Sequence, residues 1–164
     1  EKKSSKVMLL MDVGGSMNPF AGMVSALFSA ANNMQHFKDF KYYYFHNCVY
    51  ENLYTDIERQ DAIPTADVLR QYDNDYRVIF VGDAAMAPYE LLDAGGRIYY
   101  YDPFNETPGI VWLKRIREKF PKSVWLNPEI VDRYVATTRG IIAQIFPMFD
   151  LTLDGLEEAI EALL

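Results

Sequence analysis

The chain has 164 residues, of which 50 % are apolar and 15 % aromatic, a composition that excludes a disordered or fibrous protein and suits one domain with a full hydrophobic core. Its formal net charge of -7 argues against nucleic acid or an anionic membrane as the main partner, because both require a positive surface. A divalent cation or a basic protein surface fits this charge better.

A single cysteine, Cys48, excludes an internal disulfide bond and favours a reducing compartment. No apolar run approaches the roughly 18 to 20 residues that cross a bilayer, and we expect no signal peptide in the first residues of this sequence. We therefore expect a cytoplasmic protein without a membrane span. Because the first apolar run begins near the amino end, we also expect a single domain over residues 1–164 that was excised from a longer chain, with residues 1–6 as a linker remnant.

The first apolar run leads into a polar loop. Residues 7–11 predict a buried strand, and Asp12-Val13-Gly14-Gly15-Ser16-Met17 follows it. A strand that delivers a carboxylate, two glycines and a hydroxyl to a helix N-terminus suits oxygen ligation of a cation. Taken alone, the same residues are equally typical of a tight strand-to-helix turn.

The segment after this loop predicts an amphipathic helix. Asn18 is a suitable cap for it, and Pro19 suits its first turn, where a missing N–H costs nothing. Apolar residues recur at helical spacing and are expected to form one inward stripe, at Phe20, Met23, Val24, Leu27, Phe28, Ala31 and Met34.

The next segment is rich in aromatic residues. Residues 41–46 and 49–54 predict an antiparallel pair of strands. His46, at the end of the first of these strands, is interpreted as a local hydrogen-bonding residue. The polar residues 56–63 predict a loop, and Thr65 stands where a short helix over 66–72 needs its N-cap.

A second buried strand also delivers a carboxylate. Residues 77–81 form a continuous apolar run, typical of a strand covered on both faces in a parallel sheet, and Gly82-Asp83 follows. Ligands gather at the carboxyl edge of such sheets, so we expect Asp12 and Asp83 to face one crevice. After a helical turn over 88–92, a strand over 97–101 ends at Asp102, a weaker third carboxylate.

The remainder of the chain continues the alternation of helices and strands. A helix is predicted over 110–120, a strand over 123–126 and helices over 129–138 and 156–164, the last with Asp154 and Glu157 in a capping box. This alternation predicts a doubly wound α/β fold of Rossmann-like type. Its sheet is expected to be mostly parallel, with about six strands, flanking helices and one antiparallel edge strand.

Three segments resemble the metal-ion-dependent adhesion site (MIDAS) of von Willebrand factor A (VWA) domains: Met11 to Met17, Thr65, and Val81-Gly82-Asp83. In that family the first loop reads Asp-x-Ser-x-Ser, the second supplies a threonine, and the third supplies an aspartate after a buried strand. Together with residues 82–91 and Trp125-Leu126-Asn127-Pro128, these segments resemble bacterial CoxE-like proteins. The resemblance implies a VWA fold and a non-enzymatic protein-binding module. It also implies work beside a MoxR-type AAA+ ATPase in protein maturation or remodelling.

The resemblance implies Mg²⁺, or another divalent cation such as Mn²⁺ or Ca²⁺, bound by Asp12, Ser16, Thr65 and Asp83. Asp12 would act mainly through water and Ser16 directly, and an open position would accept an acidic side chain from the partner. Gly14 stands where the family has a serine. This departure removes one hydroxyl ligand, so either water replaces it or the site binds metal more weakly.

Two alternatives remain open. One is a VWA domain that has lost its metal and serves as a docking surface. The other is a haloacid-dehalogenase-like phosphatase, which also places an aspartate after its first strand and a Gly-Asp pair after a later one. The phosphatase is disfavoured because Gly14 stands at the position of its second aspartate, and Ala84, Ala85 and Ala87 stand where it needs a further acid.

Overall fold

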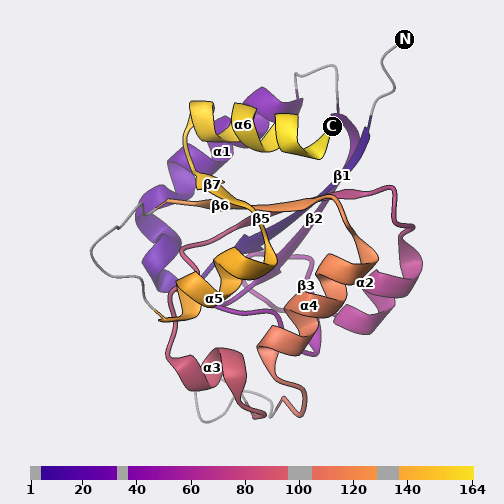
Figure 1. The fold of residues 1–164 in the computed structure, drawn as a ribbon, viewed down its shortest axis with the longest axis vertical. Helices are drawn as coiled ribbons and strands as arrows, with labels where there is room; N and C mark the ends of the chain where they lie inside the picture. Colours follow the sequence, from indigo (N-terminus) through magenta and orange to yellow (C-terminus); the bar gives the residue numbers. More distant parts are fainter. Residues whose placement is uncertain (1–4, 33–36, 96–104, 129–136) are drawn as a thin grey trace.

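The computed structural model describes residues 5–32, 37–95, 105–128 and 137–164. Its strands are β1 (Ser5–Asp12), β2 (Phe37–Phe45), β3 (Asn52–Tyr54), β4 (Ala62–Pro64), β5 (Arg77–Val81), β6 (Ser123–Asn127) and β7 (Met148–Asp150). They form one seven-stranded sheet in the order β4-β3-β2-β1-β5-β6-β7 (Figure 1). The five strands from β2 to β7 in this order run parallel, whereas β3 is antiparallel to both β2 and β4. The predicted α/β class is confirmed, with a longer antiparallel edge than expected.

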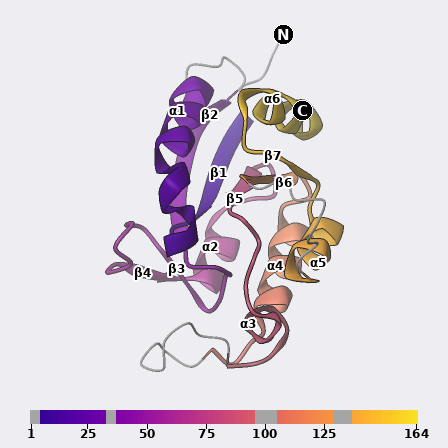
Figure 2. The same cartoon turned by 90° about the vertical axis from the view of Figure 1, so that its left-hand side faces the viewer.

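Helices cover both faces of this sheet. They are the 3-10 helix η1 (Gly15–Phe20) and the α-helices α1 (Ala21–Asn32), α2 (Thr65–Gln71), α3 (Pro88–Leu92), α4 (Gly109–Lys119), α5 (Thr137–Ile145) and α6 (Leu153–Leu163). Helices α1 and α6 lie on one face, and α2, α4 and α5 lie on the other (Figures 1 and 2). No helix in the described ranges is long and apolar enough to cross a membrane.

The central strand β1 is buried on both sides, which explains its continuous apolar sequence. Side chains alternate along a strand, so Val7, Leu9 and Met11 pack in the core under α1 and α6, while Met8 and Leu10 pack in the core under α2, α4 and α5. Because both of its faces are covered, β1 is held in a fixed position. Asp12 at its end is held in a fixed position as well.

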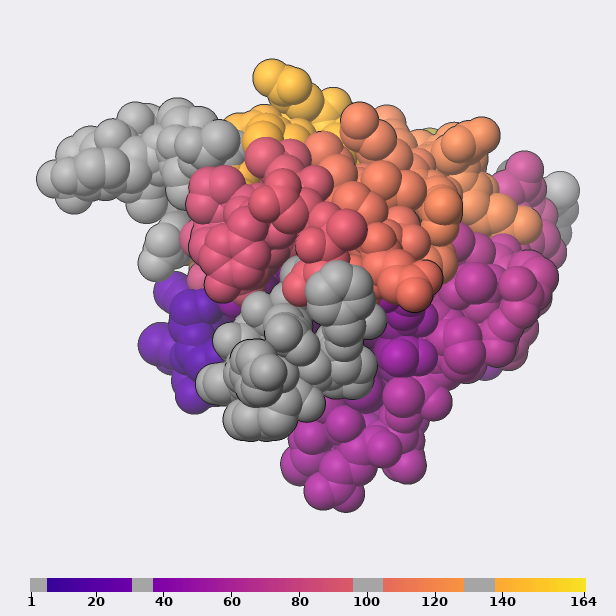
Figure 3. Space-filling model, turned by 90° about the horizontal axis from the view of Figure 1, so that it is seen from below, coloured from indigo at the N-terminus to yellow at the C-terminus, as the bar shows by residue number. Residues whose placement is uncertain are grey.

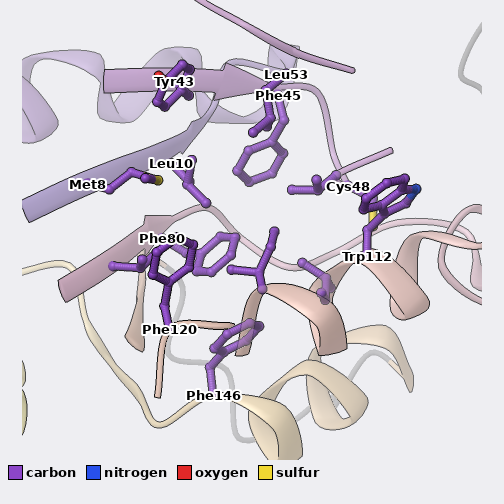
Figure 4. Packing of buried hydrophobic residues seen from close by; sticks show 14 of the residues in the cluster. Met8, Leu10, Tyr43, Phe45, Cys48, Leu53, Phe80, Trp112, Phe120 and Phe146 are labelled. Atoms are coloured by element: carbon purple, nitrogen blue, oxygen red, sulfur yellow. The ribbon is translucent and has the colours of Figure 1, made fainter. Parts of the chain in front are cut away.

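Aromatic rings fix the carboxyl ends of three strands relative to one another. The ring of Phe80 in β5 stacks on Trp125 of β6, with centroids 4.8 Å apart and planes 7° apart. Phe45 of β2 packs against both rings at 6.3 Å, and Phe146 lies 4.6 Å from Phe80 (Figure 4). These contacts hold the edge of the sheet where the polar loops emerge.

The entry into α1 differs from the prediction. The chain first forms η1, in which the Met17 N–H donates to the Gly14 carbonyl at 2.9 Å, so Pro19 lies inside a 3-10 helix rather than in the first α-helical turn. Asn18 therefore does not cap α1. Along the predicted stripe, Met23 is 46 % exposed, because it faces solvent rather than the sheet.

Several predicted boundaries were wrong. Strand β1 begins at Ser5, so residues 5 and 6 belong to the strand rather than to a linker. Strand β2 begins at Phe37 instead of residue 41, and β3 retains only three residues of the predicted run 49–54. The antiparallel pairing of β2 with β3 is confirmed by Tyr44 opposite Tyr54.

Two strands were missed, and helix α5 shares only residues 137–138 with the helix predicted over 129–138. β4 falls in the predicted loop 56–63, and β7 and α5 lie beyond the last predicted strand. Both missed strands have only three residues, too few to show an alternating pattern, so their formation depends on pairing with β3 and β6. The predicted strand over 97–101, Asp102, Met34 and residues 129–136 lie outside the described residues.

Two predicted helix caps were also wrong. Pro64 occupies the N-cap position of α2, and Thr65 is its first helical residue. Helix α6 begins at Leu153, and its cap is Thr152, whose side chain accepts a hydrogen bond from the Gly155 N–H at 3.0 Å. The true cap stands two residues before Asp154, because the chain turns into the helix directly after β7.

Candidate functional site

Asp12 and Asp83 lie at the carboxyl ends of the two central strands. Met11 pairs with Val81, so Asp12 stands opposite Gly82, and Asp83 follows one residue later. The connection after β1 leads to β2 on one side, whereas β5 lies on the other side. Asp12 and Asp83 thus mark the topological switch point, where open α/β sheets bind ligands. Both aspartates are buried, at 5 % and 6 % exposure.

The two carboxylate oxygens of Asp12 have different surroundings. Oδ1 accepts hydrogen bonds from the backbone N–H of Gly14 at 2.8 Å and of Asn47 at 3.1 Å. Oδ2 is buried and has no hydrogen-bond partner in the described part of the chain. The pKa of Asp12 is raised from 3.8 to about 6, mainly by burial and also by the nearby charge of Asp83, while the two backbone hydrogen bonds act to lower it. A buried carboxylate oxygen without a hydrogen-bond partner is costly for the folded chain, and a bound cation would offset that cost.

Asp83 begins a tight turn. Its Oδ1 accepts a hydrogen bond from the Ala85 N–H at 3.1 Å, which orients the carboxylate. Ala84, between them, has a φ of 57°, in the left-handed region that favours glycine. Such local strain persists only where surrounding contacts hold it, and it is common at functional sites.

The surrounding contacts are hydrogen bonds to three successive carbonyl oxygens. Trp125 Nε1 donates to Gly82 at 2.8 Å, Asn127 Nδ2 donates to Asp83 at 3.0 Å, and the Thr138 hydroxyl donates to Ala84 at 2.8 Å. Trp125 and Asn127 both belong to β6. The segment Trp125-Leu126-Asn127-Pro128 therefore supports the loop that carries Asp83.

Gly82 allows the two central strands to approach closely at this edge. A Cβ atom at Gly82 would lie 3.0 Å from Asp12 Cβ and 3.3 Å from the Trp125 ring. A side chain at this position would therefore require Asp12 or the Trp125 ring to shift by a few tenths of an ångström.

The other two predicted ligands are placed differently. Ser16 lies in η1, in the same loop as Asp12, and is exposed. Thr65 is fully buried, and its hydroxyl donates to the Tyr50 carbonyl at 2.5 Å. That bond uses the hydrogen of the hydroxyl and leaves its oxygen lone pairs available. Within the described residues, the hydrogen bonds of Thr65 lead to Tyr50 and Glu51 rather than to Asp12 or Asp83.

The space beside Gly14 is already filled. A Cβ atom there would lie 2.6 Å from His46 Cδ2 and 2.9 Å from Asn47 Oδ1. The side chains of His46 and Asn47 therefore occupy the space that a side chain at position 14 would need. This packing requires a glycine at position 14.

Sequence reasoning missed a bridge between the first and third loops. Asn47, with a φ of 63°, donates its backbone N–H to Asp12 and its side-chain amide to Glu90 Oε1 at 3.2 Å. Glu90 in α3 is 7 % exposed, and its Oε2 accepts from the Ala87 N–H at 2.8 Å. The asparagine in a short turn after an aromatic strand was the available signal, because asparagine tolerates the left-handed region.

The donor set suits a hard cation. No group of three or more His, Cys, Asp or Glu side chains that could hold a metal occurs among the described residues. A cation here would instead depend on two carboxylates, hydroxyls and water, which are the ligands that Mg²⁺ prefers. The unpartnered Oδ2 of Asp12 fits this role.

The site lies among segments from distant parts of the sequence. Figure 3 views the molecule from below, with the segment of η1 and α1 in indigo, that of β3 and β4 in magenta and α3 in rose.

Comparisons of the chain with known protein families, with curated proteins and with solved structures found no match. The proposals below therefore depend on the residues and their geometry.

Proposed function

We propose that this chain is a VWA-like, CoxE-like module that binds a protein partner through a divalent cation, most simply Mg²⁺, at the carboxyl edge of its sheet. The observation that carries this proposal is the buried pair of Asp12 and Asp83 on adjacent parallel strands, with Asp12 Oδ2 lacking a hydrogen bond. Burying two like charges side by side is unfavourable, and a bound cation offsets that cost.

The sheet supports the same proposal. Its central β1, the parallel β5 beside it and an antiparallel extension at one edge agree with the arrangement that the VWA resemblance implies. The Trp125 and Asn127 side chains, which belong to the CoxE-like segments, hold the loop that carries Asp83.

Each proposed ligand has its own role. Asp12 is oriented through Oδ1 by two backbone N–H groups and presents Oδ2 to the cation, directly or through water. Asp83 is oriented by the Ala85 N–H and supplies the second carboxylate. Ser16 supplies a hydroxyl from η1. Thr65 needs to act from its buried place beside Tyr50, so its contribution is the most indirect of the four.

The partner is proposed to offer an acidic side chain to the remaining coordination position of the cation. A MoxR-type AAA+ ATPase, in the cytoplasm, is the partner that the resemblance implies. No turnover of a substrate is proposed, because Gly14 and the alanines 84, 85 and 87 leave the loops without the acids that phosphoryl transfer needs. Phosphatase activity toward p-nitrophenyl phosphate that is abolished by Asp12→Asn would overturn this part of the proposal.

Calorimetric titration with MgCl₂ tests the proposal. The wild-type chain should release or absorb heat with a single-site isotherm, and Asp83→Asn should abolish it, since it removes one carboxylate while keeping the oxygen that accepts from Ala85. Asp150→Asn is the matched control, because Asp150 ends the parallel strand β7 at the same edge and is exposed. No heat in the wild type, or the same heat from Asp83→Asn as from Asp150→Asn, would contradict the metal proposal. The metal-free docking alternative would then be favoured instead.

A further inference from the structure

A groove runs between helix α1 and strand β2, on the face of the sheet that α1 covers. It encloses about 420 Å³. Val24 and Phe28 of α1 line one side, and Tyr42 and Tyr44 of β2 line the other. Figure 2 shows α1 lying along β1 and β2 on this side of the molecule. The volume falls within the roughly 300 to 1,000 Å³ typical of small-molecule sites, and the lining is mainly apolar and aromatic, as in such sites.

The floor of the groove is part of the hydrophobic core. Met11 of β1, Val81 of β5 and Met17 of η1 line it, and all three are buried in the cluster under α1 and α6. At the rim, Ile57 in the loop between β3 and β4 is 60 % exposed, and Tyr42 is 37 % exposed. Large apolar side chains that gather in the open beside a hollow are typical of ligand-binding grooves.

The side chains that line the groove carry no charge. Asp12 contributes to the lining, but side chains alternate along β1, so its carboxylate lies with Met8 and Leu10 on the opposite face of the sheet. Every other lining residue in the described part of the chain is apolar or carries a hydroxyl or an amide. The pKa of Tyr44 is raised, mainly by burial and also by Tyr42 beside it, so its hydroxyl stays protonated at neutral pH. The groove therefore offers no ionic partner to a charged ligand.

We propose that this groove binds an uncharged aromatic molecule, with its ring system between α1 and β2 and a hydroxyl or carbonyl group at the rim. The rings of Phe28, Tyr42 and Tyr44 supply aromatic faces for the ring system. Ser25 and Ser29 of α1, which line the groove and are exposed, supply neutral hydrogen-bonding groups at the rim. An ammonium or carboxylate group would lose hydration in the groove without gaining an opposite charge, so charged ligands are disfavoured.

This inference goes beyond the proposed cation site and does not depend on it. The carboxylate of Asp12 lies on the other side of β1, so a ligand in the groove and a cation at Asp12 would occupy different places. The groove is therefore tested in EDTA. Failure of ligand binding there leaves the magnesium titration unaffected, and failure of that titration leaves the ligand result unaffected.

The experiment compares three probes of similar shape by NMR titration of the ¹⁵N-labelled chain at pH 7, in EDTA and about 0.15 M salt to screen the net charge of the chain. They are 1-naphthalenemethanol, which is neutral, 1-naphthylmethylamine, which is a cation, and 1-naphthoate, which is an anion. The alcohol should bind at least about tenfold more tightly than either charged probe, because only the alcohol enters without burying a charge. Shifts should concentrate on α1, β2 and the loop between β3 and β4. No binding of the alcohol, or binding of a charged probe as tight as that of the alcohol, would overturn the proposal.

Two neighbouring positions on α1 provide matched variants. Ser25 lines the groove, whereas Ala26 does not, and both side chains are exposed. Ser25→Trp should fill the groove and weaken binding of the alcohol at least about tenfold, and Ala26→Trp should leave it unchanged. Ser25→Glu places a carboxylate at the groove and should make the amine bind more tightly than the alcohol, whereas Ala26→Glu should keep the wild-type order. Wild-type binding by folded Ser25→Trp, or the same order of probes in Ser25→Glu and Ala26→Glu, would overturn the proposal.

Discussion

The loop of Asp12 and the turn of Glu90 both bury a carboxylate within one hydrogen-bond network, yet they satisfy it differently. Each oxygen of Glu90 accepts a hydrogen bond, from Asn47 Nδ2 and from the Ala87 N–H. Asp12 has two donors on Oδ1 and none on Oδ2 among the described residues. Both carboxylate oxygens of Glu90 therefore accept hydrogen bonds from within the chain, whereas only one oxygen of Asp12 does. This difference is the basis of the proposal that the Asp12 loop binds a cation.

Neutralising Asp12 should have the largest effect on stability. Burial raises its pKa from 3.8 to about 6. At about 1.4 kcal/mol per pKa unit, ionised Asp12 costs the folded state about 3 kcal/mol. Asp12→Asn should therefore raise the free energy of unfolding by up to about 3 kcal/mol at neutral pH in EDTA, as measured by urea denaturation. It should also abolish any stabilisation by Mg²⁺.

The pH dependence of the same measurement identifies the cause. The folded chain holds the Asp12 proton up to about pH 6, whereas the unfolded chain loses it near 3.8, so this contribution to wild-type stability falls as the pH rises through that window. Asp12→Asn should lack this fall. A loss of stability in Asp12→Asn across the whole pH range would instead mean that both carboxylate oxygens are structural.

Neutralising Glu90 should have a smaller effect of opposite sign. In Glu90→Gln one of the two oxygens becomes an NH₂ group that faces an N–H donor, whichever way the amide is turned. Leaving one donor unsatisfied should lower the free energy of unfolding by about 1 to 3 kcal/mol in urea denaturation.

A control separates this loss from a general effect on the turn. Asn47→Gly keeps the backbone N–H to Asp12 and suits the φ of 63°, and it removes only the amide that donates to Glu90. It should cost less than Glu90→Gln. If Glu90→Gln proves as stabilising as Asp12→Asn, the contrast between the two carboxylates fails.

The sequence was most informative where burial is complete. The continuous apolar runs of β1 and β5 predicted two central strands, and from them the placement of Asp12 and Asp83 at one edge. Strands β4 and β7 were missed because three residues carry too little periodicity, and pairing with β3 and β6 decides their conformation.

The details of the site depend on contacts between distant residues, which local patterns do not encode. Nothing near Gly14 in the sequence indicates that His46 and Asn47 fill the space beside it. The bridge from Asn47 to Glu90 joins residues 43 positions apart. Thr65 looked like an N-cap by its local sequence, but its hydroxyl donates to Tyr50.

The most direct test of the central claim is an NMR titration of the Asp12 carboxyl carbon, in EDTA and in saturating Mg²⁺. In EDTA its pKa should be about 6, the value that burial produces. In Mg²⁺ the pKa should fall well below 6, because a cation at Oδ2 favours the ionised form. A pKa near 3.8 in EDTA, or the same pKa with and without Mg²⁺, would contradict the claim that Asp12 holds an oxygen free for a cation.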